Sequence, residues 1–199
     1  MERWPLLLAA MVWPAPAWAH GSVAGLQGIY SGMLHPFTSG PQLLALFAMA
    51  LVIQQRLPDS EDVFHAFWAS CLAGAGAAAL GLGGMSPDIP LTVFAVVAGV
   101  LVASALRPPL SALLLLGMTC GLLSGYLSWP DPGAKGDMMF TALGAIIGSV
   151  LIVIVVAGIV ELVWQTRRWP WLPIAARVAG SWVTAIAVLL GALTIRGTP

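Results

Sequence analysis

Six apolar stretches, each about as long as a bilayer is thick, dominate this sequence. A helix crosses the hydrocarbon core with about 20 mostly apolar residues. Hydrophobic residues make up 59% of the chain and charged residues 8%, whereas soluble domains carry about 25% charged residues. The sequence therefore predicts an all-α integral membrane bundle of six transmembrane helices. The predicted spans are Leu26–Ile53, Val63–Leu82, Ile89–Leu106, Leu110–Leu127, Met138–Trp164 and Leu172–Ile195.

Polar and helix-breaking residues interrupt the first span. His35-Pro36, Ser39-Gly40-Pro41 and Gln42 all fall within a short part of this apolar run. A proline leaves the carbonyl four residues earlier without a donor. Irregular backbone at membrane depth is tolerated only where it is buried in protein or lines a cavity. We therefore predict that the first helix is broken here and that the break faces a site.

The first 19 residues have the pattern of a secretion signal. Arg3 supplies a positive start, Leu6–Val12 an apolar core, and Ala17-Trp18-Ala19 a small-x-small cleavage site. The short core and the two prolines that follow it disfavour the alternative, an uncleaved spanning anchor. The predicted division is a signal peptide over 1–19 and a six-helix transmembrane domain over 20–199, with His20 as the mature N-terminus.

The positive charges predict the orientation of the helices. Loops on the cytoplasmic side of a membrane carry an excess of Lys and Arg. With the mature N-terminus outside, five arginines fall on the inner side and two basic residues on the outer side: Arg56, Arg107, Arg167, Arg168 and Arg177 against Lys135 and Arg196. We therefore expect a multi-pass protein of the bacterial inner membrane with both mature termini in the periplasm.

Several function classes are disfavoured by what the sequence lacks. It has no basic block that would favour nucleic acid, and no nucleophile–base pair, phosphate loop or dinucleotide fingerprint that would favour an enzyme. Cys71 and Cys120 lie inside apolar runs without a C-x-x-C partner, which is typical of buried free thiols. We expect no enzymatic activity.

Two histidines are the strongest candidates for metal ligands. A neutral imidazole binds nickel, cobalt, copper and zinc. His35 lies at the predicted break, and His20 would add its free α-amine after signal cleavage. The alternatives are that His35 caps the broken helix or bonds to a neighbouring helix, and that His20 is a polar residue left by cleavage.

The stretch HPFTSGPQLLALFAMAL over 35–51 resembles the signature of the HupE/UreJ family of small bacterial membrane proteins. Their first helix carries His-Pro-x-x-Gly-x-Asp-His followed by Leu-Leu-Ala-Met. His35 and Pro36 match, whereas the Gly falls on Ser39, the Asp on Pro41 and the second His on Gln42. Family members are regarded as nickel or cobalt permeases tied to hydrogenase or urease maturation. The resemblance implies that role here, with nickel or cobalt as transported ion rather than resident cofactor.

A second family motif, Phe-His-Gly-x-Ala-His in the fourth helix, falls on LSGYLS over 123–128. Gly125 matches, but both histidines fall on serines, Ser124 and Ser128, which lie four apart on one helix face. The resemblance thus implies weak metal donors at Gln42, Ser124 and Ser128 beside His20 and His35. Hydroxyls are poor ligands for borderline metals, so hydrogen bonding between helices is the favoured interpretation of the two serines.

Two functions follow from this sequence. One is a permease for a divalent metal; because no ATP-binding element is present, transport would be passive, gradient-driven or powered by a separate subunit. The other is a degenerate family member that does not transport and acts as a membrane scaffold or accessory subunit. Expected partners are membrane lipid, a metal ion, and other membrane subunits or further copies of the chain, with no nucleic acid.

Overall fold

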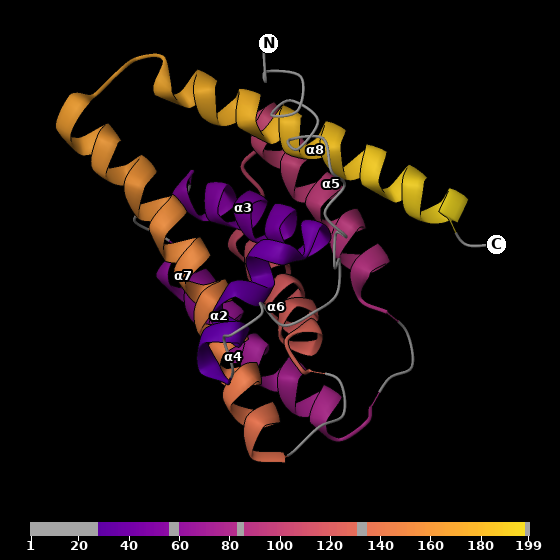
Figure 1. The fold of residues 1–199 in the computed structure, drawn as a ribbon. Coiled ribbons are helices and arrows are strands. Elements are labelled where there is room, and N and C mark those ends of the chain that lie inside the picture. The colour runs from indigo at the N-terminus through magenta and orange to yellow at the C-terminus, as the bar shows by residue number, and fades with distance from the viewer. Residues whose placement is uncertain (1–27, 56–59, 83–85, 131–134, 198–199) are drawn as a thin grey trace, which may run out of the picture.

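A computed structural model describes residues 28–55, 60–82, 86–130 and 135–197. These residues form seven helices and no strand, which confirms the all-α prediction for the described part of the chain (Figure 1). The predicted signal peptide lies outside the described residues. The helices are α2 (Ile29–Thr38), α3 (Gly40–Gln54), α4 (Glu61–Ala79), α5 (Asp88–Ser104), α6 (Leu110–Leu127), α7 (Lys135–Arg167) and α8 (Leu172–Gly197).

Each predicted span overlaps one of these helices, or the pair α2 and α3 for the first span. Within the described residues, α6, α7 and α8 are long and apolar enough to cross a membrane, and the bent pair α2 and α3 adds a fourth when it is counted as one span. Helix α5 is apolar but has only 17 residues. Helix α4 begins with two acidic residues. The structure therefore supports a multi-pass membrane protein, while the number of six spans stays a prediction.

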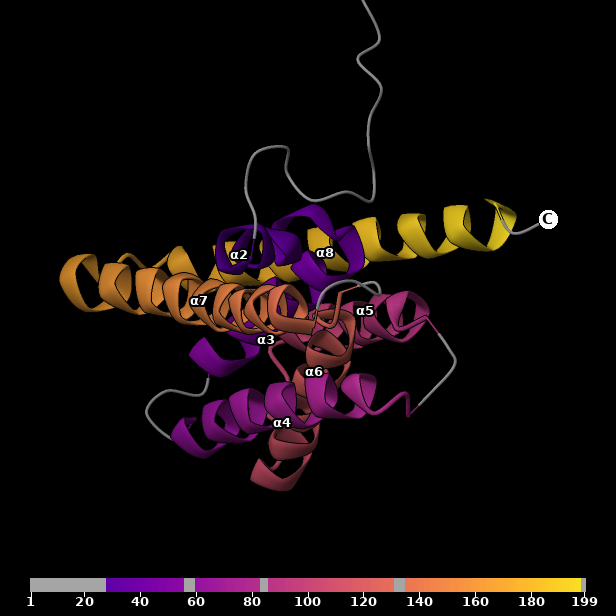
Figure 2. The same cartoon turned by 60° about the horizontal axis from the view of Figure 1, so that its bottom comes forward.

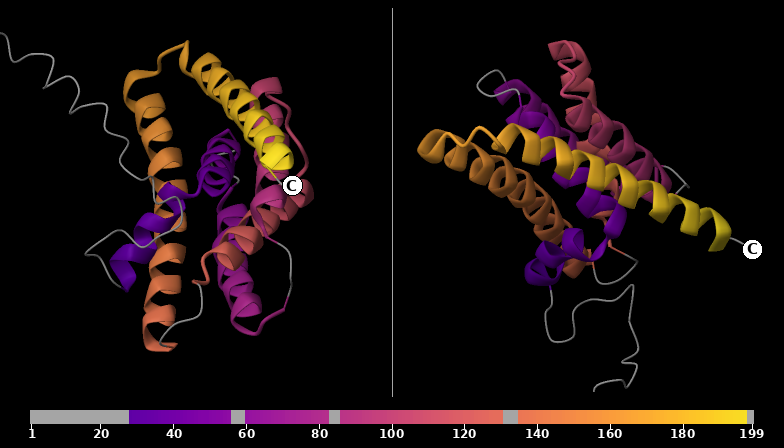
Figure 3. Two further views of the ribbon diagram at one scale, coloured as in Figure 1. Left: turned by 45° about the vertical axis from the view of Figure 1, so that its right-hand side comes forward. Right: turned by 90° about the horizontal axis from the view of Figure 1, so that it is seen from above.

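The helices form three close pairs around α3. Helix α4 packs against α6, α5 against α8, and α2 against α7, while α3 contacts members of all three pairs (Figures 1 and 2). Helices α7 and α8 meet at one end of the molecule and diverge from there (Figure 3). Because all three pairs pack against α3, this single helix lies at the centre of the bundle.

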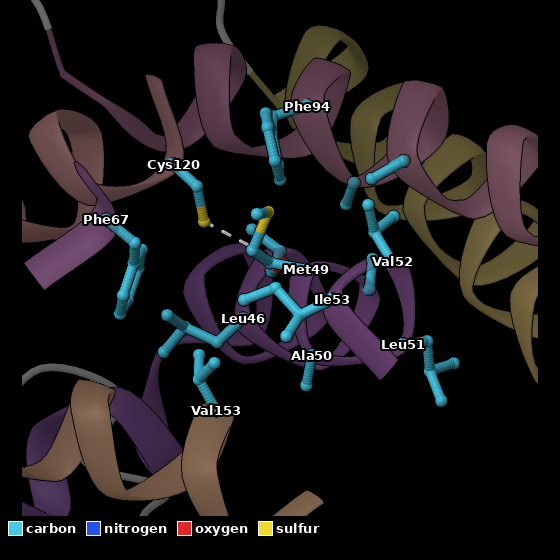
Figure 4. Packing of buried hydrophobic residues seen from close by; sticks show 14 of the residues in the cluster. Leu46, Met49, Ala50, Leu51, Val52, Ile53, Phe67, Phe94, Cys120 and Val153 are labelled. Carbon is cyan, nitrogen blue, oxygen red and sulfur yellow. Dashed lines mark hydrogen bonds between the residues drawn. The ribbon is translucent and has the colours of Figure 1, made fainter. Parts of the chain in front are cut away.

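The second half of helix α3 is buried around its whole circumference. All residues from 48 to 53 are buried, whereas a surface helix buries only one stripe. Phe67 of α4, Phe94 of α5 and Cys120 of α6 approach it from different sides (Figure 4). Val153 of α7 closes the remaining side, so α3 is the core of the described fold.

Glycines allow the paired helices to approach closely. Gly121 and Gly125 of α6 lie against the carbonyl oxygens of Phe67 and Cys71 in α4, where a Cβ atom would overlap. Small residues at such crossings let the backbones of membrane helices touch. The other two pairs also have glycines at their close contacts. These are Gly144 and Gly148 of α7, against the backbone of α2, and Gly99 and Gly180, between α5 and α8.

The predicted interruption of the first helix is confirmed. Helix α2 ends at Thr38, α3 begins at Gly40, and their axes differ by 82°. Between them Ser39 is extended (φ −88°, ψ 106°), and its Oγ accepts from the Gln42 amide at 3.4 Å, as an N-cap residue does. Pro41, in the first turn of α3, lacks the amide hydrogen that a continuous helix would use. The Ser-Gly-Pro sequence therefore ends one helix and starts the next.

Replacing Gly125 by alanine should weaken the pairing of α4 and α6. The new Cβ would overlap the Cys71 carbonyl oxygen, so the two backbones must separate. Overpacking of this kind costs about 1–3 kcal/mol. We expect a lower unfolding midpoint for Gly125→Ala in detergent micelles, followed by circular dichroism during titration with dodecyl sulfate.

The matched control is Gly76→Ala in α4, where an added Cβ meets no atom within 4 Å. It should unfold at the wild-type midpoint or slightly above it. Equal losses in both variants, or no loss for Gly125→Ala, would contradict the close approach of these helices.

Candidate functional site

Four buried polar residues lie close together just after the break in the first span, where α3 packs against α6 and α7. They are Gln42 of α3, Ser124 of α6, Ser128 at the C-cap of α6, and Ser149 of α7, each at most 2% exposed. Gln42 Nε2 donates to the Ser124 carbonyl oxygen at 3.3 Å and to Ser149 Oγ at 3.2 Å. Ser128 Oγ donates to the same Ser124 carbonyl at 2.7 Å. We call these four residues the buried polar cluster.

The break and the cluster are connected through Gln42. Its backbone amide binds the Ser39 cap, and its side chain reaches α6 and α7 from the first turn of α3. Gln42 lies in the first turn of α3, directly after the 82° bend, so one residue belongs both to the start of the new helix and to the cluster.

The hydrogen bonds determine which way the Gln42 amide points. The Ser124 carbonyl can only accept, and the Ser149 hydroxyl already donates its proton to the Ala145 carbonyl oxygen at 2.9 Å. Both partners therefore need a donor, which the two Nε2 hydrogens supply. A reversed amide would set the Gln42 oxygen against two acceptors, so Oε1 must face away from them.

Two polar atoms of the cluster remain unsatisfied. Gln42 Oε1 and Ser124 Oγ are buried and have no oxygen or nitrogen partner in the described part of the chain, and the Cys120 thiol, a weak hydrogen-bonding group, lies beside Ser124. Leaving such a group unpaired costs about 1–3 kcal/mol. A water or a small cation would remove this cost, because amide and hydroxyl oxygens bind either. These two oxygens are therefore the atoms of the cluster that a small oxygen-seeking ligand would contact.

The structure brings three of the five predicted metal-site residues together. Gln42 and Ser124 are bonded directly, and Ser128 joins them through the Ser124 carbonyl. The hydroxyl of Ser128 thus bonds within its own helix, and the bond between helices is made by the Ser124 backbone. This arrangement depends on how α6 packs against α3, which the spacing of the residues in the sequence does not reveal.

The two histidines are placed differently. His35 lies in the last turn of α2, partly buried, with its Nε2 shielded from solvent. Its carbonyl oxygen accepts from Thr38 Oγ1 at 2.8 Å and from the Ser39 amide at 3.2 Å, so its backbone helps to end α2. His20 lies outside the described residues. Metal binding by His20 and His35 stays a prediction.

Sequence reasoning missed Ser149. It is one serine in a long apolar run, and nothing in that run indicates which face of α7 meets α3. The only sequence signal is the Gly144–Gly148 pair, which marks the face toward α2. Ser149 follows Gly148 directly. It becomes part of the site only because Gln42 of α3 forms a hydrogen bond with it.

The donor chemistry of the cluster differs from that of a strong transition-metal site. Nickel, cobalt and zinc prefer imidazole, thiolate and carboxylate ligands. Among residues 28–55, 60–82, 86–130 and 135–197, no group of three His, Cys, Asp or Glu side chains is placed to hold a metal ion. Cys71 and Cys120 are buried free thiols, as predicted, and Cys120 Sγ faces the Ala45 carbonyl oxygen at 3.9 Å (Figure 4). The cluster offers neutral oxygens instead.

Comparison with known proteins identifies the chain by its family. A family model described as HupE / UreJ protein matches residues 8–190. Neither the curated proteins nor the solved structures include a significant match. The family match extends over the broken first span and all the helices that form the buried polar cluster. The chain belongs to the HupE/UreJ family.

Proposed function

We propose that this protein is an inner-membrane permease that passes a divalent metal ion, such as Ni²⁺ or Co²⁺, across the bilayer. Its family is associated with nickel and cobalt transport. The observation that carries the proposal is the convergence of three motif positions. Gln42, Ser124 and Ser128 correspond to the three later histidines of the family motifs, and they meet in one buried cluster below a broken helix.

The weak donors of the cluster suit passage better than storage. Conduction requires a site that binds an ion strongly enough to admit it and weakly enough to release it. Neutral amide and hydroxyl oxygens hold a borderline metal more loosely than imidazoles do. The unsatisfied Gln42 Oε1 and Ser124 Oγ are the atoms available to such an ion. His35, before the bend, would contact the ion ahead of the cluster, and His20 would capture it at the outer surface.

The proposal includes the topology that the sequence predicts. The signal peptide over 1–19 is removed, six spans follow, and both mature termini lie in the periplasm. The excess of arginines on the inner side supports this orientation. Movement of the ion is driven by its own gradient or by a coupled one, and the protein carries out no catalysis.

One observation favours a second function. The described residues hold no group of three strong metal ligands, and the hydrogen bonds of Gln42 tie α3, α6 and α7 together. Hydrogen bonds between helices stabilise membrane bundles. In this second function the protein is a non-transporting scaffold or accessory subunit, and the cluster only stabilises the fold.

Metal uptake into liposomes separates the two functions. The purified protein would be reconstituted into liposomes that contain a metal-sensitive dye. We expect Ni²⁺ or Co²⁺ to enter these liposomes faster than dye-filled liposomes without protein. Gln42→Leu removes the amide and should slow entry about tenfold, the scale of losing one group around a metal. The control Gln165→Leu makes the same change at an exposed position of α7 and should leave entry unchanged. Entry no faster than in empty liposomes would refute transport and leave the scaffold function.

Restoring imidazoles tests whether the motif positions truly converge. The Gln42 and Ser124 positions are bonded to each other, so Gln42→His with Ser124→His places two imidazoles in one site. We expect the double variant to bind Ni²⁺ at least about tenfold more tightly than wild type in calorimetric titration. The control combines Gln42→His with Ser181→His, whose serine is exposed on α8. Equal affinities for the two double variants would contradict the convergence.

A further inference from the structure

A second polar site lies at the opposite end of α3 from the break. A cavity of about 390 Å³ opens where α3, α5 and α7 end and α8 begins. Its charged and amide side chains are Gln54, Gln55, Arg107, Glu161 and Arg177. It shares no residue with the buried polar cluster, and nothing in the proposed transport function uses it.

Positive charge dominates this cavity. Arg177 Nε donates to the Ala103 carbonyl oxygen at 2.9 Å, which holds the guanidinium at the end of α5 and leaves its terminal NH₂ groups available. Neither Arg107 nor Arg177 forms an ion pair with any residue that the structure describes. The carboxylate of Glu161 accepts from Gln165 at 2.8 Å. Two arginines against one carboxylate repel a cation and attract an anion.

The backbone at the end of α5 places Arg107 on the cavity wall. Ala105 takes a left-handed conformation (φ 51°), which ends the helix and turns the chain into Leu106 and Arg107. Non-glycine residues rarely adopt this conformation. The turn sets an exposed arginine beside Leu106, which is itself 59% exposed.

Apolar side chains complete the cavity. Leu106, Trp164 and Leu172 line it together with Pro173. Trp164 is 40% exposed and lies near the end of a long apolar helix, where tryptophan is enriched at membrane interfaces. A cavity with cationic groups and an apolar wall at this level matches a molecule with an anionic head and an apolar tail.

We propose that this cavity binds the phosphate headgroup of an anionic phospholipid of the inner leaflet. Arg107 and Arg177 would bind the phosphate oxygens, since guanidinium groups match phosphate geometry. The acyl chains would lie along Leu106 and Trp164. Basic pockets between membrane helices on the cytoplasmic side bind such headgroups. The inference rests on the proposed orientation of the helices, but not on metal transport.

Lipid titration of the purified full-length protein tests this proposal. Native mass spectrometry in neutral detergent would measure binding of phosphatidylglycerol, phosphatidylcholine and inorganic phosphate. We expect phosphatidylglycerol to bind about tenfold more tightly than phosphatidylcholine, and raised salt to weaken it. Arg107→Gln with Arg177→Gln should abolish the preference. Arg196→Gln, near the far end of α8, should not change it.

Additional variants distinguish a loss of lipid binding from a loss of folding. Arg107→Gln alone removes a side chain that has no described partner, so the fold should survive while the preference falls several-fold. Arg107→Lys with Arg177→Lys keeps the charge and should keep most of the preference. Equal binding of the two lipids, or wild-type preference in the Gln variants, would overturn the proposal. Inorganic phosphate binding as tightly as phosphatidylglycerol would assign the cavity to a small anion and overturn the lipid assignment.

Discussion

The break at Ser39 is the constraint on which the rest of the structure depends. A membrane helix has to satisfy its backbone groups internally, so a bend of 82° needs local replacements for the missing bonds. Ser39 and Thr38 supply them, through the serine cap on α3 and two donors to the His35 carbonyl. The bend lets α2 pack on α7 while α3 runs through the middle of the bundle. Without the bend, one straight helix would have to lie both beside α7 and in the centre of the bundle.

Burial of α3 explains why polar groups can exist at the centre. Its neighbours come from three helix pairs whose glycines bring backbones into contact. In this surrounding, the side chain of Gln42 has no access to water, so its amide hydrogens bind the Ser124 carbonyl and Ser149. The same packing leaves Gln42 Oε1 unsatisfied. A buried acceptor without a donor costs about 1–3 kcal/mol, and the proposed passage of a metal ion gives this atom a role.

The surroundings of the two ends of α3 differ in charge, so the two ends of the molecule offer different environments to an ion. The break and the cluster carry neutral oxygens, whereas the cavity at the other end carries two arginines and one carboxylate. A divalent cation meets only neutral oxygens in the first environment, whereas the two arginines repel it in the second. If the protein passes a metal as proposed, the ion leaves by a route other than this cavity, and the arginines serve the proposed lipid contact instead.

The sequence predicts the elements better than their arrangement. Pro36 and the Ser39-Gly40-Pro41 run predict the broken helix, because proline and glycine act locally. Burial of Cys71 and Cys120 follows equally from the apolar runs around them. The central position of α3 is not predictable, since its residues are as uniformly apolar as those of a lipid-facing helix. Ser149 and the arginine-lined cavity depend on which helices pair, and no local pattern contains that information.

A double-mutant cycle on Gln42 and Ser149 tests the central claim most directly. That claim is that Gln42, directly after the bend, ties α3 to α7 through its hydrogen bond to Ser149. The free energy of unfolding in detergent would be measured for Gln42→Leu, Ser149→Ala and the double variant. We predict a coupling of about 0.5–1.5 kcal/mol, the range of hydrogen bonds between membrane helices. Additive losses, with no coupling between the two positions, would contradict it.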